Sequence, residues 1–139
     1  LAEMLGLDNV YFLDNGFVAV GELDYPMSMD DFAQYVSECL DCNGIRYTDN
    51  DRLIKKVAVG GGACAEFMQQ ACENSDCFVT GDLKYHDMLD ASEQGFAVVS
   101  AGHFETENKP FLSLYDALSK MFSDVEFVLS EQENAVKTI

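Results

Sequence analysis

Three short apolar segments, each ending in glycine, constrain the fold of this chain more than any other feature. Residues 65–71, 85–94 and 112–122 follow these segments with apolar side chains at helical spacing. Such an alternation of strands and helices predicts an α/β fold, with a mostly parallel or mixed sheet flanked by helices on both faces. The three segments are residues 57–59, which run into Gly60, Gly61 and Gly62; residues 77–80, before Gly81; and residues 96–101, before Gly102.

The remaining elements are shorter. Residues 9–12, 16–22 and 45–47 are expected to be strands, and Ser28 is the expected N-cap of a helix. Residues 125–128 are expected to form the last strand, before a polar tail over residues 131–139. At 139 residues the chain is expected to be a single α/β domain, 1–139. The absence of an initial Met favours a piece of a longer chain.

The composition excludes several classes of function. Acidic residues number 25 against 8 basic ones, for a net charge of −17, so the surface repels phosphate backbones and no direct nucleic-acid binding is expected. No apolar run approaches the roughly 20 residues of a membrane span, and no secretory signal pattern is present, so no membrane partner is expected.

The five cysteines favour reduced thiols and a cytoplasmic location, because their number is odd and no export signal accompanies them. Cys39 and Cys42 have the spacing of redox and zinc motifs, but no second pair of this kind exists. The pair is therefore interpreted as the end of a helix, and the remaining cysteines as small buried side chains.

Residues 102–107 read Gly-His-Phe-Glu-Thr-Glu and predict a metal site. His103 follows the strand over residues 96–101, and the carboxyl ends of strands are where open α/β sheets place their ligands. In a helical turn, His103 and Glu107 share one face, so both can reach one cation. The alternative is a histidine that donates to a backbone carbonyl near the surface.

Two other glycine turns complete the expected crevice. The triple glycine at residues 60–62 precedes a helix and could present N–H groups to a phosphate, although a tight turn alone would explain it. Residues 80–87 place Asp82, Lys84, Tyr85 and His86 in one short loop, a set able to bind an anion or move a proton. The plainer interpretation is that Asp82 caps a helix and that Lys84 is solvated.

The segment over residues 57–107 resembles the GTP cyclohydrolase 1 type 2 homologues, also called the NGG-interacting-factor-three-like family. Three motifs match in order: Val-Ala-Val running into glycines at 57–62, Thr-Gly-Asp-x-Lys-Tyr-His-Asp at 80–87, and Gly-His-Phe-x-Thr-Glu at 102–107. Upstream, residues 21–23 and 26–28 resemble the lead-in to this half of the family sequence. The likeness extends from about residue 10 to about residue 130.

The resemblance implies an α/β protein with a dinuclear divalent-metal site, to which His103 and Glu107 contribute ligands. It also implies metal-assisted hydrolysis, with Lys84 and His86 nearby to handle protons or an anionic substrate such as a nucleotide, and assembly into homo-oligomers. Zinc, iron, manganese, cobalt and nickel all suit such ligands. The His-His pair of the family's N-terminal half is absent, since His86 and His103 are the only histidines. The chain is therefore expected to be the C-terminal half of a two-part fold, inactive by itself and a weak metal binder.

Three functions are consistent with the sequence. The first is the C-terminal portion of a metal-dependent hydrolase, cyclohydrolase-like when full length. The second is a non-enzymatic metal-binding scaffold or regulatory protein whose acidic surface meets partners. The third is a nucleotide sensor that would use the glycines at residues 60–62.

Overall fold

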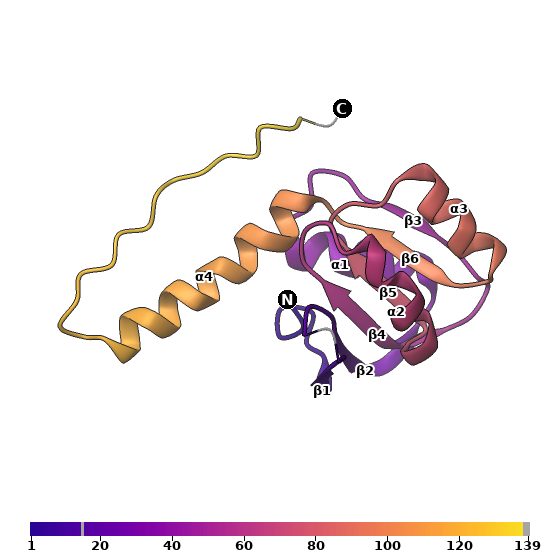
Figure 1. Ribbon diagram of the computed structural model, residues 1–139, viewed down its shortest axis with the longest axis horizontal. Helices are drawn as coiled ribbons and strands as arrows, with labels where there is room; N and C mark the ends of the chain where they lie inside the picture. Colours follow the sequence, from indigo (N-terminus) through magenta and orange to yellow (C-terminus); the bar gives the residue numbers. More distant parts are fainter. Residues whose placement is uncertain (15, 138–139) are drawn as a thin grey trace.

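The computed structural model describes residues 1–14 and 16–137 and has a six-stranded mixed sheet at its centre (Figure 1). The strands lie in the order β1-β2-β4-β5-β6-β3, and β4, β5 and β6 run parallel while the outer pairings are antiparallel. The mixed form of the predicted α/β fold is thus confirmed. The strands are β1 (Asp8–Phe12), β2 (Ala19–Met27), β3 (Arg46–Thr48), β4 (Ile54–Gly60), β5 (Cys77–Thr80) and β6 (Ala97–Ser100).

Helices cover both faces of the sheet, as predicted. Helix α1 (Met29–Leu40) packs on one face, and α2 (Met68–Asn74) and α3 (Tyr85–Glu93) pack on the other. A 3-10 turn, η1 (Ala65–Phe67), leads into α2. Residues that alternate along each central strand divide between the two layers, because successive strand side chains point to opposite faces. Val57, Val79 and Val99 therefore belong to the α1 core, whereas Phe78 and Val98 belong to the core under α2 and α3.

Local sequence explains where the helices begin and end. Ser28 accepts a hydrogen bond from the backbone N–H of Asp31 at 3.2 Å, which confirms the predicted N-cap of α1. Helix α3 ends at Glu93, shortly before Gly95. Gly95 has a φ of +68°, the left-handed conformation that glycine commonly adopts beyond a helix end.

All five cysteines are free thiols, and Cys39 and Cys42 lie at the end of α1 as interpreted. Burial raises the pKa of Cys42 to about 11, so this thiol is not activated.

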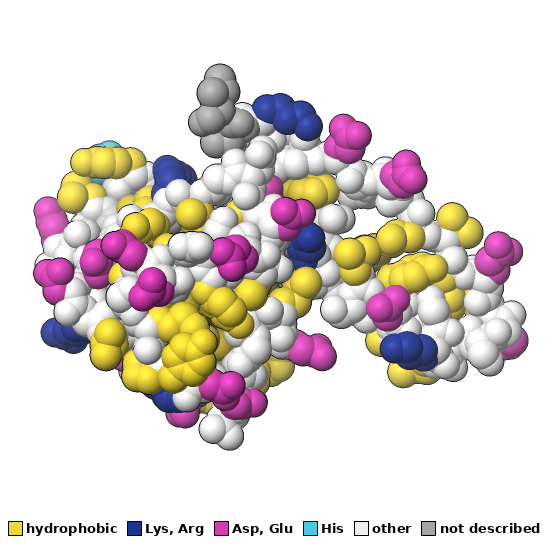
Figure 2. All heavy atoms as spheres, turned by 180° about the vertical axis from the view of Figure 1, so that it is seen from behind, with side chains coloured by type: hydrophobic (Ala, Val, Ile, Leu, Met, Phe, Trp, Pro, Cys, Tyr) yellow, Lys and Arg dark blue, Asp and Glu magenta, His cyan; other side chains and the backbone are white. Residues whose placement is uncertain are grey.

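Helix α4 (His103–Met121) projects from the body of the molecule (Figure 1). Only Glu105 and Thr106 of this helix are buried, and several of its hydrophobic side chains are exposed, among them Phe111, Leu114 and Met121. Figure 2 shows hydrophobic side chains on the projecting part of the molecule. The C-terminal segment returns beside the helix, where Tyr115 donates to the carbonyl of Phe127 and Asn134 donates to the carboxylate of Glu105 at 2.9 Å.

The expected strand over residues 125–128 is wrong. These residues are irregular, and none of the strand pairings among the described residues includes them. Their alternating pattern suits a strand, but a strand needs a neighbouring edge to receive its backbone hydrogen bonds, and here they run beside a helix instead. The tail is polar and irregular through residue 137, while residues 138–139 of the expected tail lie outside the described residues. Within the described chain, no helix is long and apolar enough to cross a bilayer.

Candidate metal centre

The carboxyl ends of the three parallel strands meet at one point of the sheet. The backbone N–H of Gly81 donates to the carbonyl of Gly62 at 2.8 Å, and the N–H of Gly102 donates to the carbonyl of Gly81 at 3.0 Å. The glycine turns after β4, β5 and β6 are therefore hydrogen-bonded side by side. The sequence predicts that these glycine turns meet at the ends of the parallel strands, which is where such sheets place their ligand sites.

The first turn of α4 fits closely into these glycine turns. A side chain on Gly81 would begin 2.7 Å from the carbonyl oxygen of Gly62, 2.7 Å from Thr106 Oγ1 and 2.8 Å from the Cα of His103. Gly62 has a left-handed φ of +64°, and a Cβ there would collide with the carboxylate of Glu107. The lack of side chains at these positions lets the helix carrying His103 start directly on the strand ends.

Thr106 fastens this turn of α4 to the sheet. Its Oγ1 accepts a hydrogen bond from the N–H of Gly62 at 3.0 Å and lies 2.8 Å from the carbonyl oxygen of Gly102, to which it donates. The side chain is 1% exposed, so these bonds form away from competing water. Thr106 lies in the predicted metal motif, but the sequence assigned it no role. Its position three residues after His103, in the first turn of a helix, is the one sequence signal that could have indicated its contact with the glycine turns.

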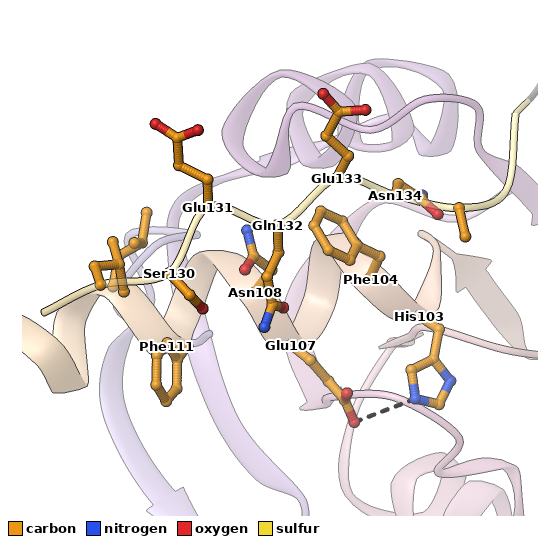
Figure 3. A pocket seen from close by; sticks show the side chains of 13 residues that line it. His103, Phe104, Glu107, Asn108, Phe111, Ser130, Glu131, Gln132, Glu133 and Asn134 are labelled. Carbon is orange, nitrogen blue, oxygen red and sulfur yellow. Dashed lines mark ion pairs between the residues drawn. The ribbon is translucent and has the colours of Figure 1, made fainter.

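His103 lies between two carboxylates at the start of α4. Its Nδ1 is 2.6 Å from Oδ2 of Asp82, and its Nε2 is 3.3 Å from Oε1 of Glu107. Figure 3 shows the imidazole and the Glu107 side chain pointing toward one another. About half of each side chain is exposed, with values of 48% for His103, 60% for Asp82 and 59% for Glu107, so the site is open to solvent.

The two carboxylates change the titration of the ring. The hydrogen bond to Asp82 raises the pKa of His103 above its usual 6.5, the charges of Glu107 and Asp82 act in the same direction, and partial burial opposes them. Because the pKa of His103 is higher in the folded than in the unfolded protein, protonation of the ring stabilises the fold, and this stabilisation is fully present below pH 6.5. That contribution is lost as the pH rises through the folded pKa.

We expect the substitution Asp82→Asn to lower the pKa of His103, since it removes the carboxylate that holds the imidazolium form. An NMR titration of the ring Cε1–H measures this, and His86 supplies the only other histidine signal. Asp87→Asn is the matched control, because Asp87 accepts from the backbone N–H of Lys84 and does not touch the ring. An unchanged His103 titration in Asp82→Asn would contradict this electrostatic account.

The donor set partly fits a divalent cation. Asp82 on Nδ1 favours the tautomer in which Nε2 carries the free electron pair. Metal-binding histidines are commonly oriented in this way, by a carboxylate, a backbone carbonyl or a water on the other ring nitrogen. The free Nε2 then faces the Glu107 carboxylate, and both are common ligands for a transition-metal ion. Among residues 1–14 and 16–137, no group of three or more His, Cys, Asp or Glu side chains could hold a metal ion. Of the predicted metal ligands, the described residues thus bring together two side chains, His103 and Glu107.

Three other side chains predicted for the site, those of Lys84, Tyr85 and His86, have no bond with this pair among the described residues. Lys84 precedes α3 as its N-cap residue, with its backbone N–H bonded to Asp87 at 2.8 Å. Tyr85 and His86 are exposed in the first turn of α3, where their rings pack edge to face. Neither side chain has a hydrogen bond or ion pair with His103 or Glu107 in the part of the chain that the structure describes.

The glycines at residues 60–62 are also used for packing. A Cβ on Gly60 would lie 2.9 Å from the Cβ of Cys64, and one on Gly61 would lie 3.1 Å from the carbonyl oxygen of Thr106. The N–H of Gly62 already donates to Thr106. A tight turn accounts for these contacts. Because the N–H of Gly62 is already bonded to Thr106, it is not free to bind a phosphate.

A groove opens next to His103 and Glu107, between α4 and the C-terminal segment (Figure 3). Its volume is about 800 Å³, and it begins at His103 and Glu107 and extends past Phe111. Residues 129–135 form its other wall. The sequence did not predict this wall, because an irregular tail carries no periodic pattern that could place it.

Comparisons with known proteins agree on one family. A sequence profile of the Duf34/NIF3 (NGG1p interacting factor 3) family matches residues 1–135. A GTP cyclohydrolase 1 type 2 homolog of Haemophilus influenzae is 33% identical over 133 residues, which cover 91% of this chain and 53% of the relative. One of the same name from Staphylococcus epidermidis is 38% identical over 91 residues, covering 64% of this chain and 25% of the relative. The matches thus span about half or less of these relatives.

Solved structures show the same fold. The hypothetical protein SA1388 of Staphylococcus aureus superposes with a TM-score of 0.80 at 22% identity, covering 88% of this chain and 55% of that one. A Bacillus cereus protein related to NIF3 superposes with a TM-score of 0.68 at 31% identity, covering 82% of this chain and 33% of that one.

Proposed function

This chain belongs to the Duf34/NIF3 (NGG1p interacting factor 3) family, and from that premise we propose that it carries part of the metal site of a divalent-metal-dependent hydrolase. The single observation that carries the proposal is the arrangement of His103. One ring nitrogen lies 2.6 Å from Asp82, and the other lies 3.3 Å from the Glu107 carboxylate at the mouth of an open groove.

Each side chain has a separate task in this proposal. Asp82 keeps the proton on Nδ1, so that the electron pair of Nε2 stays available. Glu107 supplies negative charge on the same side of the ring. When bound, a divalent cation supplies Lewis acidity and lowers the pKa of water toward neutrality. The open groove beside the two ligands leaves room for a substrate to approach.

The complete site requires more ligands than this pair, since zinc sites commonly have three or four protein ligands. We propose that two ions bind in the full-length protein, with the other ligands supplied from outside the described residues. Zinc, iron, manganese, cobalt and nickel remain equivalent on ligand chemistry. The proposed substrate is a nucleotide or another small anion, and the proposed assembly is a homo-oligomer. By itself this half is expected to bind metal weakly and to have no turnover.

We expect His103→Ala to remove divalent-metal binding. Mn²⁺ is a suitable probe, because it prefers oxygen and nitrogen ligands over the thiolates of the five cysteines. Free Mn²⁺ is counted by its electron paramagnetic resonance signal at increasing protein concentration. His86→Ala is the matched control, since His86 is exposed on α3 and has no hydrogen bond or ion pair with Glu107 among the described residues.

The proposal is sustained if His103→Ala loses Mn²⁺ binding while His86→Ala retains it. Equal binding in wild type and His103→Ala would overturn it. Hydrolysis of GTP, measured with a family-length chain carrying the same substitution, then separates an enzyme from a protein that only binds metal.

A metal-binding scaffold is the second candidate, and the exposed apolar side chains of α4 favour it. Phe111 is 53% exposed, Leu114 is 51% exposed and Met121 is 72% exposed, which suits a surface that meets another protein. If metal binding needs His103 and the family-length chain hydrolyses no nucleotide, the scaffold is the better description.

A further inference from the structure

The position of the Asp82 carboxylate is not fixed by side-chain packing. This side chain is 60% exposed, and the hydrogen bond from His103 is the only one it makes among the described residues. An exposed aspartate side chain can sample several rotamers, and its carboxylate reaches a given partner only if the backbone places its Cα within range. The contact with Nδ1 at 2.6 Å therefore depends on what holds the loop that carries Asp82.

The carbonyl groups on both sides of Asp82 are held by hydrogen bonds. Before it, the carbonyl of Gly81 accepts from Ser100 Oγ at 3.0 Å and from the N–H of Gly102 at 3.0 Å. After it, the carbonyl of Leu83 accepts from Arg46 Nη2 at 2.8 Å. Asp82 thus lies between two anchored carbonyl groups, one held by Ser100 and Gly102 and the other by Arg46 on β3, and its own N–H donates to the carbonyl of Gly62 at 3.1 Å.

Arg46 acts on both of these supports. Its Nη2 also lies 3.3 Å from Ser100 Oγ, the hydroxyl that donates to Gly81. The register of the sheet explains this, because Arg46 pairs with Ser100 across β3 and β6. The two hydrogens of one guanidinium nitrogen can reach two acceptors at once, in a fixed planar geometry that a lysine lacks.

We propose that Arg46 is a positioning residue for the metal centre. It holds the backbone on each side of Asp82, Asp82 holds the tautomer of His103, and Nε2 is thereby left free toward Glu107. This role adds a residue to the proposed metal site, and it therefore rests on the proposed function. The plainer alternative is that Arg46 only fastens the short edge strand β3 to the sheet, where backbone bonds to β6 already exist.

The test compares Arg46→Met with Arg52→Met. These are the only two arginines of the chain, so both variants lose the same charge. No side-chain bond of Arg52 is present in the described structure, whereas its backbone N–H bonds to Asn50. The readout is the nitrogen NMR spectrum of His103 in metal-free protein, at a pH well above its titration, because this spectrum reports which ring nitrogen carries the proton.

We expect a single tautomer protonated on Nδ1 in wild type and Arg52→Met, and a mixture of the two tautomers in Arg46→Met. We also expect the dissociation constant for Mn²⁺ to rise about tenfold in Arg46→Met, as for other substitutions behind a metal ligand. Arg46→Lys keeps the charge but has a shorter reach, and a smaller shift toward the mixture is expected. This variant serves if Arg46→Met does not fold.

An Arg46 variant that folds and keeps the wild-type tautomer would overturn the proposal, even if its melting temperature fell, because a purely structural role predicts that result. The tautomer is measured without metal, so the two proposals fail separately. Wild-type protein that binds no Mn²⁺ contradicts the proposed function, whereas an unchanged tautomer contradicts the role of Arg46.

Discussion

Replacing Gly81 by alanine is expected to destabilise the fold by about 3 kcal/mol, near the upper end of typical overpacking penalties, and to displace His103. The added Cβ would lie 2.7–2.8 Å from the carbonyl oxygen of Gly62, from Thr106 Oγ1 and from the Cα of His103. Two of these three atoms are backbone, so no side-chain rotation relieves the contacts. The strand ends and the first turn of α4 must move apart instead.

Urea denaturation measures the stability of this variant, and the NMR signals of the His103 ring report on the site. Gly95→Ala is the control, because Gly95 has a φ of +68° with nothing near its missing Cβ. Its left-handed strain should destabilise by roughly 1–2 kcal/mol and leave the ring signals unchanged. A Gly81→Ala protein with wild-type ring signals would contradict the close fit of α4 on the glycine turns.

Replacing Phe78 by alanine is expected to remove about 3–5 kcal/mol of stability without altering the site. Phe78 is fully buried on β5, in the core under α2 and α3, and is among the largest buried side chains. Truncation leaves a cavity that close-packed neighbours fill only in part. Since domains of this size are stable by about 5–15 kcal/mol, the loss is a large fraction of the total.

Phe12→Ala is the control that distinguishes the effect of removing a buried ring from the effect of removing any ring. Phe12 lies on the edge strand β1 with 69% of its surface exposed, so its truncation should change stability by no more than about 0.5 kcal/mol. Equal urea midpoints for the two variants would contradict the assigned core. Mn²⁺ affinity under native conditions should match wild type in both, because Phe78 lies in the core under α2 and α3 and Phe12 lies on the edge strand β1.

The sequence predicted the parts of the fold that depend on local chemistry. Strands β4, β5 and β6 can be recognised in the sequence as apolar runs, because both of their faces are buried. Ser28 marks the start of a helix by its capping hydrogen bond, and Gly95 marks the end of another by its left-handed backbone. The prediction from sequence failed where strand pairing decides whether a segment becomes a strand. The segment over residues 125–128 has a strand pattern without a partner, and no local signal reveals whether a partner strand exists.

The sequence by itself determined that His103 and Glu107 share one face of a helix at a strand end, because helix periodicity and glycine-terminated strands are local properties. Only the tertiary structure decided what surrounds them. Asp82 reaches the ring from the neighbouring strand end, and Arg46 reaches the Asp82 loop from the edge strand β3. Such contacts depend on strand order and register, which arise when the whole sheet packs and leave no periodic trace along the chain.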